Sequence, residues 1–190
     1  MSDSVHKHVV LSIQAQIGEA FTPTVLQTGA RVAAQRYQQI VIARTLAGYD
    51  ATGRRLAALK ENYRKEKFKR LRMTRPTGRY SATEPGNVLR FRGRLLRGIR
   101  ISNVRGYQNA RGEMVAEFDI GFTDPRLQKI AQGLTSGRLG RAVRPGRPFI
   151  GLCPENTARG RNERREVIGA FTQYIASQTR RKGLIVEVSY

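Results

Sequence analysis

The spacing of the hydrophobic residues changes twice along this chain, and this change limits the possible folds more than any other feature. Apolar side chains recur at helical spacing over residues 24–47 and again over residues 161–178. Between these stretches, residues 98–105 and 113–121 alternate hydrophobic and polar positions, which is the pattern of a half-buried strand. A turn-like stretch, residues 107–112, joins the two, so we predict an antiparallel hairpin. The sequence therefore predicts an α+β fold, with helices packed on a small antiparallel sheet and with extended basic arms.

The longest predicted helix has recognisable end signals. Thr22 or Thr24 can cap its start, Pro23 suits a first helical turn, and Gly48 is a natural stop. One side of this helix is predicted to carry Val25, Val32, Ala33, Tyr37, Ile40, Val41 and Arg44.

Shorter elements are predicted on either side of these stretches. Helical spacing in residues 5–20 predicts a short amphipathic helix that ends near Gly18, and a further helix is expected from Leu56 to about residue 70. Asp124 and Pro125 are expected to start a helix that runs through about Gln132. Residues 184–188 have the composition of a strand, which can extend the sheet or pair with a neighbouring subunit.

A basic stretch with two prolines precedes the last helix. Pro145 and Pro148 fix their own φ angles and push the residue before each of them towards extended geometry, which excludes a helix here. We therefore expect residues 134–148 to form an extended basic loop whose apolar end is anchored on the core. The arginines predicted to contact DNA or a partner recur at every third position: Arg138, Arg141, Arg144 and Arg147. The predicted structural anchor consists of Phe149, Ile150 and Leu152.

Positive charge is concentrated in the middle of the chain. The formal net charge is +21, and residues 64–112 alone carry 15 basic and 2 acidic side chains. Residues 64–87 are predicted to be a flexible basic insertion, either a solvated loop or an arm that orders on assembly. Its candidate contact residues are Arg64, Lys65, Lys67, Lys69, Arg70 and Arg72. Nucleic acid or an acidic protein surface would offset this charge equally well.

The sequence contains no constellation typical of an enzyme. His6 and His8 stand near the start without convergent carboxylates or cysteines, and Asp124 is better explained as a helix cap than as a partner of Asp119. No phosphate-binding glycine loop is present. We therefore expect a binding protein, not an enzyme, with no cofactor and no metal.

The single cysteine and the length of the apolar runs limit the cellular compartments in which the chain is expected to assemble. Cys153 excludes an internal disulfide and, beside an apolar run, is expected to be buried. No apolar run approaches the ~20 residues of a membrane span, and the first residues lack the plan of a signal peptide. We expect no membrane partner and a reducing cytoplasm as the place of assembly.

Three short segments, in order, resemble the phage virion morphogenesis family, whose members are tail completion or neck proteins. The first is Tyr-Asp-Ala-Thr-Gly at 49–53, followed by Leu56, Leu59, Tyr63 and Lys65, and the second is Arg-Gly-Arg-Leu-Leu-Arg-Gly-Ile at 92–99. The third combines Ala-Gln-Gly at 131–133, Arg-Pro-Phe-Ile-Gly-Leu at 147–152 and the pattern after residue 161. Together they cover roughly residues 45–178. The chain departs from the family pattern where Leu56 replaces the usual Trp, where no histidine precedes Gly133, and in its long basic insertion.

The resemblance implies a structural role in a virion. It implies a single tail-completion-like domain over residues 1–190 that joins the tail to the head connector as a homo-oligomeric ring, expected to be a hexamer, around the DNA channel. The implied location is the head–tail junction of the virion. The implied partners are a head-side connector or adaptor, tail tube or terminator proteins, and DNA contacted without sequence specificity.

An alternative function belongs to another class. The charge alone also fits a sequence-independent nucleic-acid-binding protein of ribosome-associated or DNA-packaging type. Such a protein would lose affinity for duplex DNA steeply as salt rises, whereas a neck protein would bind virion components and show little affinity for free duplex.

Overall fold

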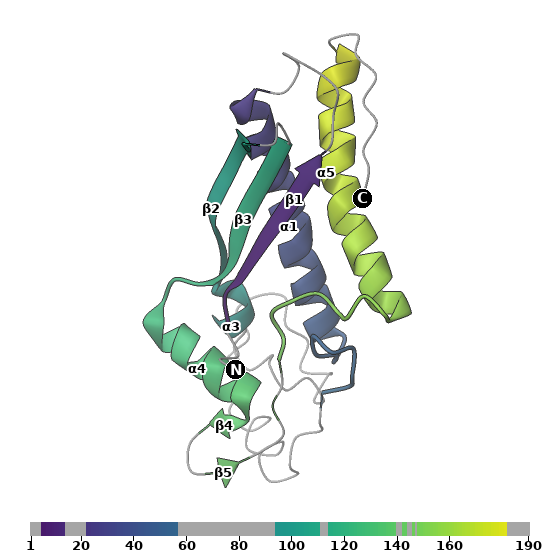
Figure 1. Cartoon of the computed structure of the whole chain (residues 1–190). Helices are drawn as coiled ribbons and strands as arrows, with labels where there is room; N and C mark the ends of the chain where they lie inside the picture. Colours follow the sequence, from purple (N-terminus) through teal and green to yellow (C-terminus); the bar gives the residue numbers. More distant parts are fainter. Residues whose placement is uncertain are drawn as a thin grey trace, which may run out of the picture.

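The fold is a small sheet with helices packed on it, as the computed structural model of the chain shows (Figure 1). The structure describes residues 5–13, 22–56, 94–110, 114–139, 142–143, 146 and 148–181. Three antiparallel strands, β1 (Lys7–Ile13), β2 (Ile99–Gln108) and β3 (Met114–Phe122), are arranged in the order β1-β3-β2. The helices are α1 (Pro23–Leu46), the short α3 (Arg94–Arg97), α4 (Pro125–Ser136) and α5 (Ala158–Arg181). This arrangement confirms the predicted α+β class.

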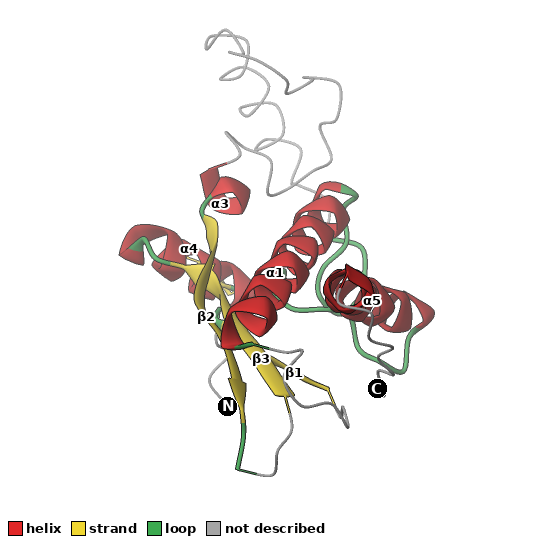
Figure 2. Cartoon of the chain, turned by 90° about the horizontal axis from the view of Figure 1, so that it is seen from above, coloured by secondary structure: helices red, strands yellow, loops and turns green. Residues whose placement is uncertain are grey.

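Two long helices cover one face of the sheet. Helix α1 packs across β2 and β3, and α5 packs against α1. Seen from above, α5 lies beside α1 towards the β1 side of the sheet (Figure 2). Among the described residues, no helix is long and apolar enough to cross a membrane.

The ends of α1 agree with the predicted signals. The Thr22 hydroxyl accepts a hydrogen bond from the backbone N–H of Val25 at 3.3 Å, and Pro23 occupies the first turn. The helix ends at Leu46, and Gly48 follows with a φ of +84°, a conformation that glycine adopts without strain. The prediction of this helix is confirmed at both ends.

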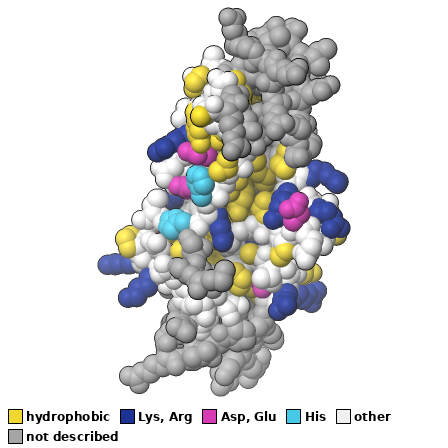
Figure 3. All heavy atoms as spheres, in the orientation of Figure 1, with side chains coloured by type: hydrophobic (Ala, Val, Ile, Leu, Met, Phe, Trp, Pro, Cys, Tyr) yellow, Lys and Arg dark blue, Asp and Glu magenta, His cyan; other side chains and the backbone are white. Residues whose placement is uncertain are grey.

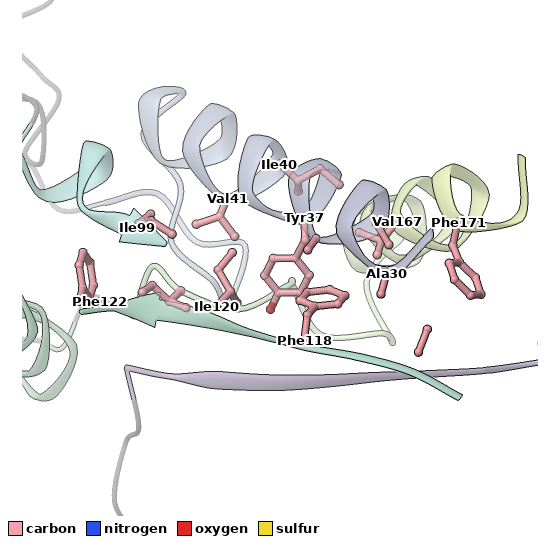
Figure 4. Packing of buried hydrophobic residues seen from close by; sticks show 14 of the residues in the cluster. Ala30, Tyr37, Ile40, Val41, Ile99, Phe118, Ile120, Phe122, Val167 and Phe171 are labelled. Atoms are coloured by element: carbon pink, nitrogen blue, oxygen red, sulfur yellow. The ribbon is translucent and has the colours of Figure 1, made fainter. Parts of the chain in front are cut away.

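The core lies between α1 and the inner face of β3. The ring of Tyr37 meets the ring of Phe118 edge-on, with centroids 6.0 Å apart, and Val41 and Ile120 lie in the same layer (Figure 4). Burial raises the pKa of the Tyr37 phenol to about 12, so its ring stays neutral in this layer.

Small residues let α5 approach α1 closely. A Cβ added at Gly29 would lie 2.8 Å from Cε2 of Phe171, so a larger side chain there would force the helices apart. Ala30 and Ala33 continue this small face, and both are fully buried.

The predicted hairpin of β2 and β3 is confirmed, with one irregularity. The register shifts between Ser102 and Arg105, and Asn103 adopts a positive φ of 50° inside this bulge. Because the bulge adds a residue to β2, Ile101 and Val104 both face inward although they are three positions apart instead of two, and both side chains pack against the core.

The predicted N-terminal helix over residues 5–20 is wrong for the residues that the structure describes. Residues 7–13 form β1, which pairs with β3 in a register that places Val9 opposite Phe118 and Leu11 opposite Ala116. The apolar residues at helical spacing also stand at alternate positions, and pairing with a long partner strand decides between the two periods. The rest of that segment, most of the expected helix after Leu56 and the strand 184–188 lie outside the described residues.

The expected basic loop over residues 134–148 is partly corrected. Asp124 caps α4 as predicted, with its Oδ1 accepting from the N–H of Arg126 at 2.8 Å, but the helix continues to Ser136. It ends at Gly137, whose φ of +72° makes this glycine the C-cap, while Gly133 is tolerated inside the helix. The chain then folds back on itself, because β4 (Arg138–Leu139) pairs with β5 (Ala142–Val143). The described residues of this segment therefore form the end of α4 and a pair of two-residue antiparallel strands, not an extended arm.

Candidate partner-contact site

Most of the predicted contact residues lie outside the described part of the chain. This holds for the six basic residues of the insertion, Arg64, Lys65, Lys67, Lys69, Arg70 and Arg72, and for Arg141, Arg144 and Arg147. The backbone of Arg138 begins β4. The structure does describe the residues that hold the C-terminal end of this basic segment.

The structure places the residues of the predicted apolar anchor in the hydrophobic core. Phe149 is fully buried and its ring lies 6.1 Å from that of Phe122, at the end of β3. Ile150 is also buried, and Leu152 is half-buried against the same core. The apolar end of the basic segment is therefore part of the hydrophobic core.

A buried arginine holds the backbone of this anchor. Nη2 of Arg44 donates to the carbonyl oxygens of Phe149 at 2.9 Å and Gly151 at 2.6 Å. Nη1 donates to Oε2 of Glu163 on α5 at 2.8 Å. The side chains of Arg44 and Glu163 are only 3% and 8% exposed, so each charge depends on the other for compensation. One guanidinium thus joins α1, the anchor and α5.

Cys153 completes this buried cluster. Its backbone N–H donates to Oε2 of Glu163 at 2.7 Å, and its Sγ lies 3.5 Å from Oε1 of the same carboxylate. Burial raises the pKa of the thiol, which keeps it protonated and unreactive. The prediction that Cys153 is buried is confirmed, although its surroundings are more polar than an apolar run implies.

The turn at residues 50–54 contacts the anchor directly. Oδ1 of Asp50 accepts from the N–H and the hydroxyl of Thr52, at 2.8 and 2.7 Å, and from the N–H of Arg54 at 3.0 Å. The N–H of Ala51 donates to the carbonyl oxygen of Pro148 at 2.6 Å. Two segments on which the resemblance rests, far apart in the sequence, therefore form one structural unit.

Basic side chains also connect this unit to the start of α5. The guanidinium of Arg159 stacks over the ring of Tyr49 at 3.8 Å from its centroid. Hydrogen bonds from Arg55 and Arg159 lower the pKa of the Tyr49 phenol. Arg164 donates to the carbonyl oxygen of Cys153 at 2.6 Å, which fixes the chain where it enters the helix.

Arg44 and Glu163, which together hold the anchor, form a clamp, and the sequence contains one signal for it. Arg44 falls on the apolar side of the predicted helix, where a charged residue needs a buried partner. Nothing in the sequence identified that partner as Glu163, because the contact depends on how α5 packs against α1.

A polar cluster around His8, on the open face of the sheet, corrects the prediction for the histidines. Nδ1 of His8 lies 2.7 Å from Oδ1 of Asp119, and Nε2 lies 3.7 Å from Oε2 of Glu117. Figure 3 shows histidine and acidic side chains close together on this face. These carboxylates do converge on His8, because β1 is a strand whose register places His8 opposite Asp119. The two ring nitrogens face different carboxylates, and among the described residues no group of three His, Cys, Asp or Glu side chains is placed to hold a metal ion.

The hydrogen bonds of this cluster shift two pKa values in opposite directions. Asn103 donates to Oδ2 of Asp119 at 2.5 Å, and this bond, together with His8, lowers the pKa of Asp119. The Tyr107 hydroxyl donates to Oε2 of Glu117 at 3.1 Å, which raises the pKa of the phenol. Each polar group has a partner within the cluster, so the arrangement stabilises the pairing of the three strands.

Comparison with known proteins found no related protein. No family model matches the chain, and neither the curated proteins nor the solved structures contain a match.

Proposed function

We propose that this protein is a structural component of a phage neck, a tail completion or terminator protein that joins the tail to the head connector. The subunit is proposed to form a homo-oligomeric ring around the DNA channel, and a hexamer is the proposed stoichiometry. The proposed partners are the connector or adaptor on the head side and tube or terminator proteins on the tail side. The proposal starts from the three segments that resemble the virion morphogenesis family.

The observation that carries the proposal is the contact between two of these segments. The N–H of Ala51, in the first segment, donates to the carbonyl oxygen of Pro148, in the third, and Arg44 of α1, just before the first segment, binds the carbonyl oxygens of Phe149 and Gly151. Segments that contact each other directly act as one structural unit, which supports reading the separate matches together.

The same contacts support a role for the basic segment in assembly. Its C-terminal end is fixed to α1 and α5 through Arg44 and Glu163, and its N-terminal end leaves from the capped end of α4. Because the described residues on both sides of this segment belong to the folded body, we propose that its arginines act from the subunit surface on an acidic neighbour or on DNA in a channel. Contacts to phosphates would carry no sequence information, in keeping with a channel through which DNA passes.

A charge-removal variant tests the proposal. Replacing Arg138, Arg141, Arg144 and Arg147 by Gln should give a folded subunit that leaves heads and tails unjoined in electron micrographs of infected cells. The matched control removes the same charge from exposed positions elsewhere, namely Arg31, Arg126, Lys129 and Arg165, and should give joined particles. Joined particles from the first variant would count against the proposed role.

The alternative function makes a different prediction for the purified chain. A sequence-independent nucleic-acid-binding protein should bind free duplex tightly at 50 mM salt and lose roughly a thousandfold or more of that affinity by 200 mM. A neck protein should bind its virion partners in preference to free duplex.

A further inference from the structure

The outer edge of β1 is open in the described part of the chain. Strand β1 pairs with β3 along Lys7–Ile13, and no other described strand pairs with it. From Val9 onwards the strand carries no proline and no charged residue, which are the features that usually protect an exposed edge. An edge of this kind is suited to accept another strand.

The inner face of β1 is also incompletely covered. Val9 and Leu11 point to the same side as the buried Phe118 and Ala116, yet both remain partly exposed. Helix α1 lies on this same face of the sheet, but it packs over β2 and β3, which leaves β1 less covered. In Figure 3, hydrophobic side chains are visible beside the histidines, on the side of the molecule that carries α5.

The width of the sheet does not match the two helices above it. Adjacent strands lie about 4.8 Å apart, so three strands span about 10 Å, whereas two packed helices of about 10 Å diameter cover about twice that width. Helix α5 lies on the β1 side of α1 (Figure 2), and its extensive contacts are with α1. A strand added to the edge of β1 would lie beneath α5.

We propose that residues 184–188 of the same chain occupy this edge as a fourth strand, antiparallel to β1. Helix α5 ends at Arg181, and Figure 1 shows α5 and β1 running in the same direction. A chain that turns back after α5 therefore runs antiparallel to β1. Two residues, Lys182 and Gly183, separate the helix from the segment, a common length for a helix-to-strand connection, and glycine suits the turn.

The side chains of the segment are compatible with pairing to β1. Its alternate residues are apolar on one face and mixed on the other, and β1 has the same pattern from Val9 onwards. Several antiparallel registers keep the apolar faces together, and the one that we propose places Leu184 opposite Leu11, Ile185 opposite Val10, Val186 opposite Val9 and Glu187 opposite His8. Ile185 would then cover Val10, which is 53% exposed, and the Glu187 carboxylate would face the His8 imidazole.

A disulfide experiment tests this register. The variant Val10→Cys/Ile185→Cys should form an intramolecular disulfide in the monomer on mild oxidation, identified by mass spectrometry of the linked peptides. The control Val10→Cys/Val186→Cys shifts one cysteine to the opposite face and should form little of it. The buried Cys153 can stay in place. Equal cross-linking in both variants, no cross-link, or a disulfide between two copies would overturn the proposal.

Hydrogen exchange gives a second test that needs no cysteine. In the full chain, alternate amides of β1 should be protected at the outer edge, and a chain ending at Gly183 should exchange them about tenfold faster or more. The amides of β3, which pair on both sides with β1 and β2, provide the internal reference. Equal exchange of β1 in the two chains would overturn the proposal.

Discussion

At the scale of single residues, Arg44 connects three separate segments of the chain. It lies on α1 and binds Glu163 on α5 and two carbonyl oxygens of the anchor. A buried ion pair of this kind contributes little over a well-packed apolar pair, but breaking it leaves an uncompensated charge. Its role is to fix one arrangement of three segments.

Removing the arginine alone should be costly. Arg44→Leu leaves Glu163 buried without a partner and should lower the free energy of unfolding by about 3–5 kcal/mol. The double variant Arg44→Leu/Glu163→Leu should recover a large part of this loss, measured by urea denaturation. Arg36→Ala is the matched control, since Arg36 and Glu166 are 45% and 47% exposed and their pair should be worth about 1 kcal/mol or less. A loss of similar size in both single variants would contradict this account.

Asp119 should make the stability of the sheet depend on pH. Its pKa in the folded state is lowered, first by the hydrogen bond from Asn103, so the carboxylate stabilises the fold above the ordinary aspartate pKa of about 3.9. This stabilisation is lost as the pH falls through the lower, folded-state pKa. Asp119→Asn should therefore be less stable than the natural chain at pH 7, and the difference should shrink below about pH 4. Urea denaturation at several pH values measures it, and a difference that stays constant with pH would contradict the assignment.

At the scale of elements, the sequence predicted those parts whose signals are local. The ends of α1, the cap of α4 by Asp124 and the β2–β3 hairpin depend on neighbouring residues, and all three are confirmed. The sequence wrongly predicts a helix where β1 lies, because the apolar residues fit both the helical and the strand period and only pairing with β3 decides between them. The end of α4 was placed too early because Gly133 and Gly137 are equivalent signals until the packing is known.

The candidate site likewise has one part that local sequence signals predict and other parts that depend on how distant elements pack. The burial of the apolar anchor could be predicted because Phe149 and Ile150 belong to a local apolar run that follows a proline-containing, non-helical stretch. The clamp of Arg44 and Glu163 could not, because it joins two helices whose relative placement no local pattern encodes. The cluster around His8 was missed for the same reason as β1 itself.

The anchor and the arginines should fail differently when altered. Phe149→Ala removes a fully buried ring and should cost about 3–5 kcal/mol, seen as a lower melting temperature. The fourfold Gln variant at 138, 141, 144 and 147 should keep the melting temperature of the natural chain within a few degrees. A large loss of stability in the fourfold variant would show that these arginines support the fold instead of contacts outside the subunit.

At the scale of the whole molecule, charge is the dominant property. A net charge of +21 on 190 residues opposes a compact state unless neighbours or a polyanion offset it. Part of this charge belongs to a basic segment whose C-terminal end is buried in the core and bound to two helices. In the proposed ring, acidic neighbours and channel DNA would supply the compensation.

The most direct test of the proposed neck function is to look for this chain in intact phage particles, since the proposal requires that a phage encodes it. A cryo-EM reconstruction should contain a ring of this α+β subunit at the junction of head and tail, with the segment before Phe149 directed at DNA density or at an adjacent ring. Density for the chain at any other place in the particle, or its absence from complete particles, would contradict the proposed function.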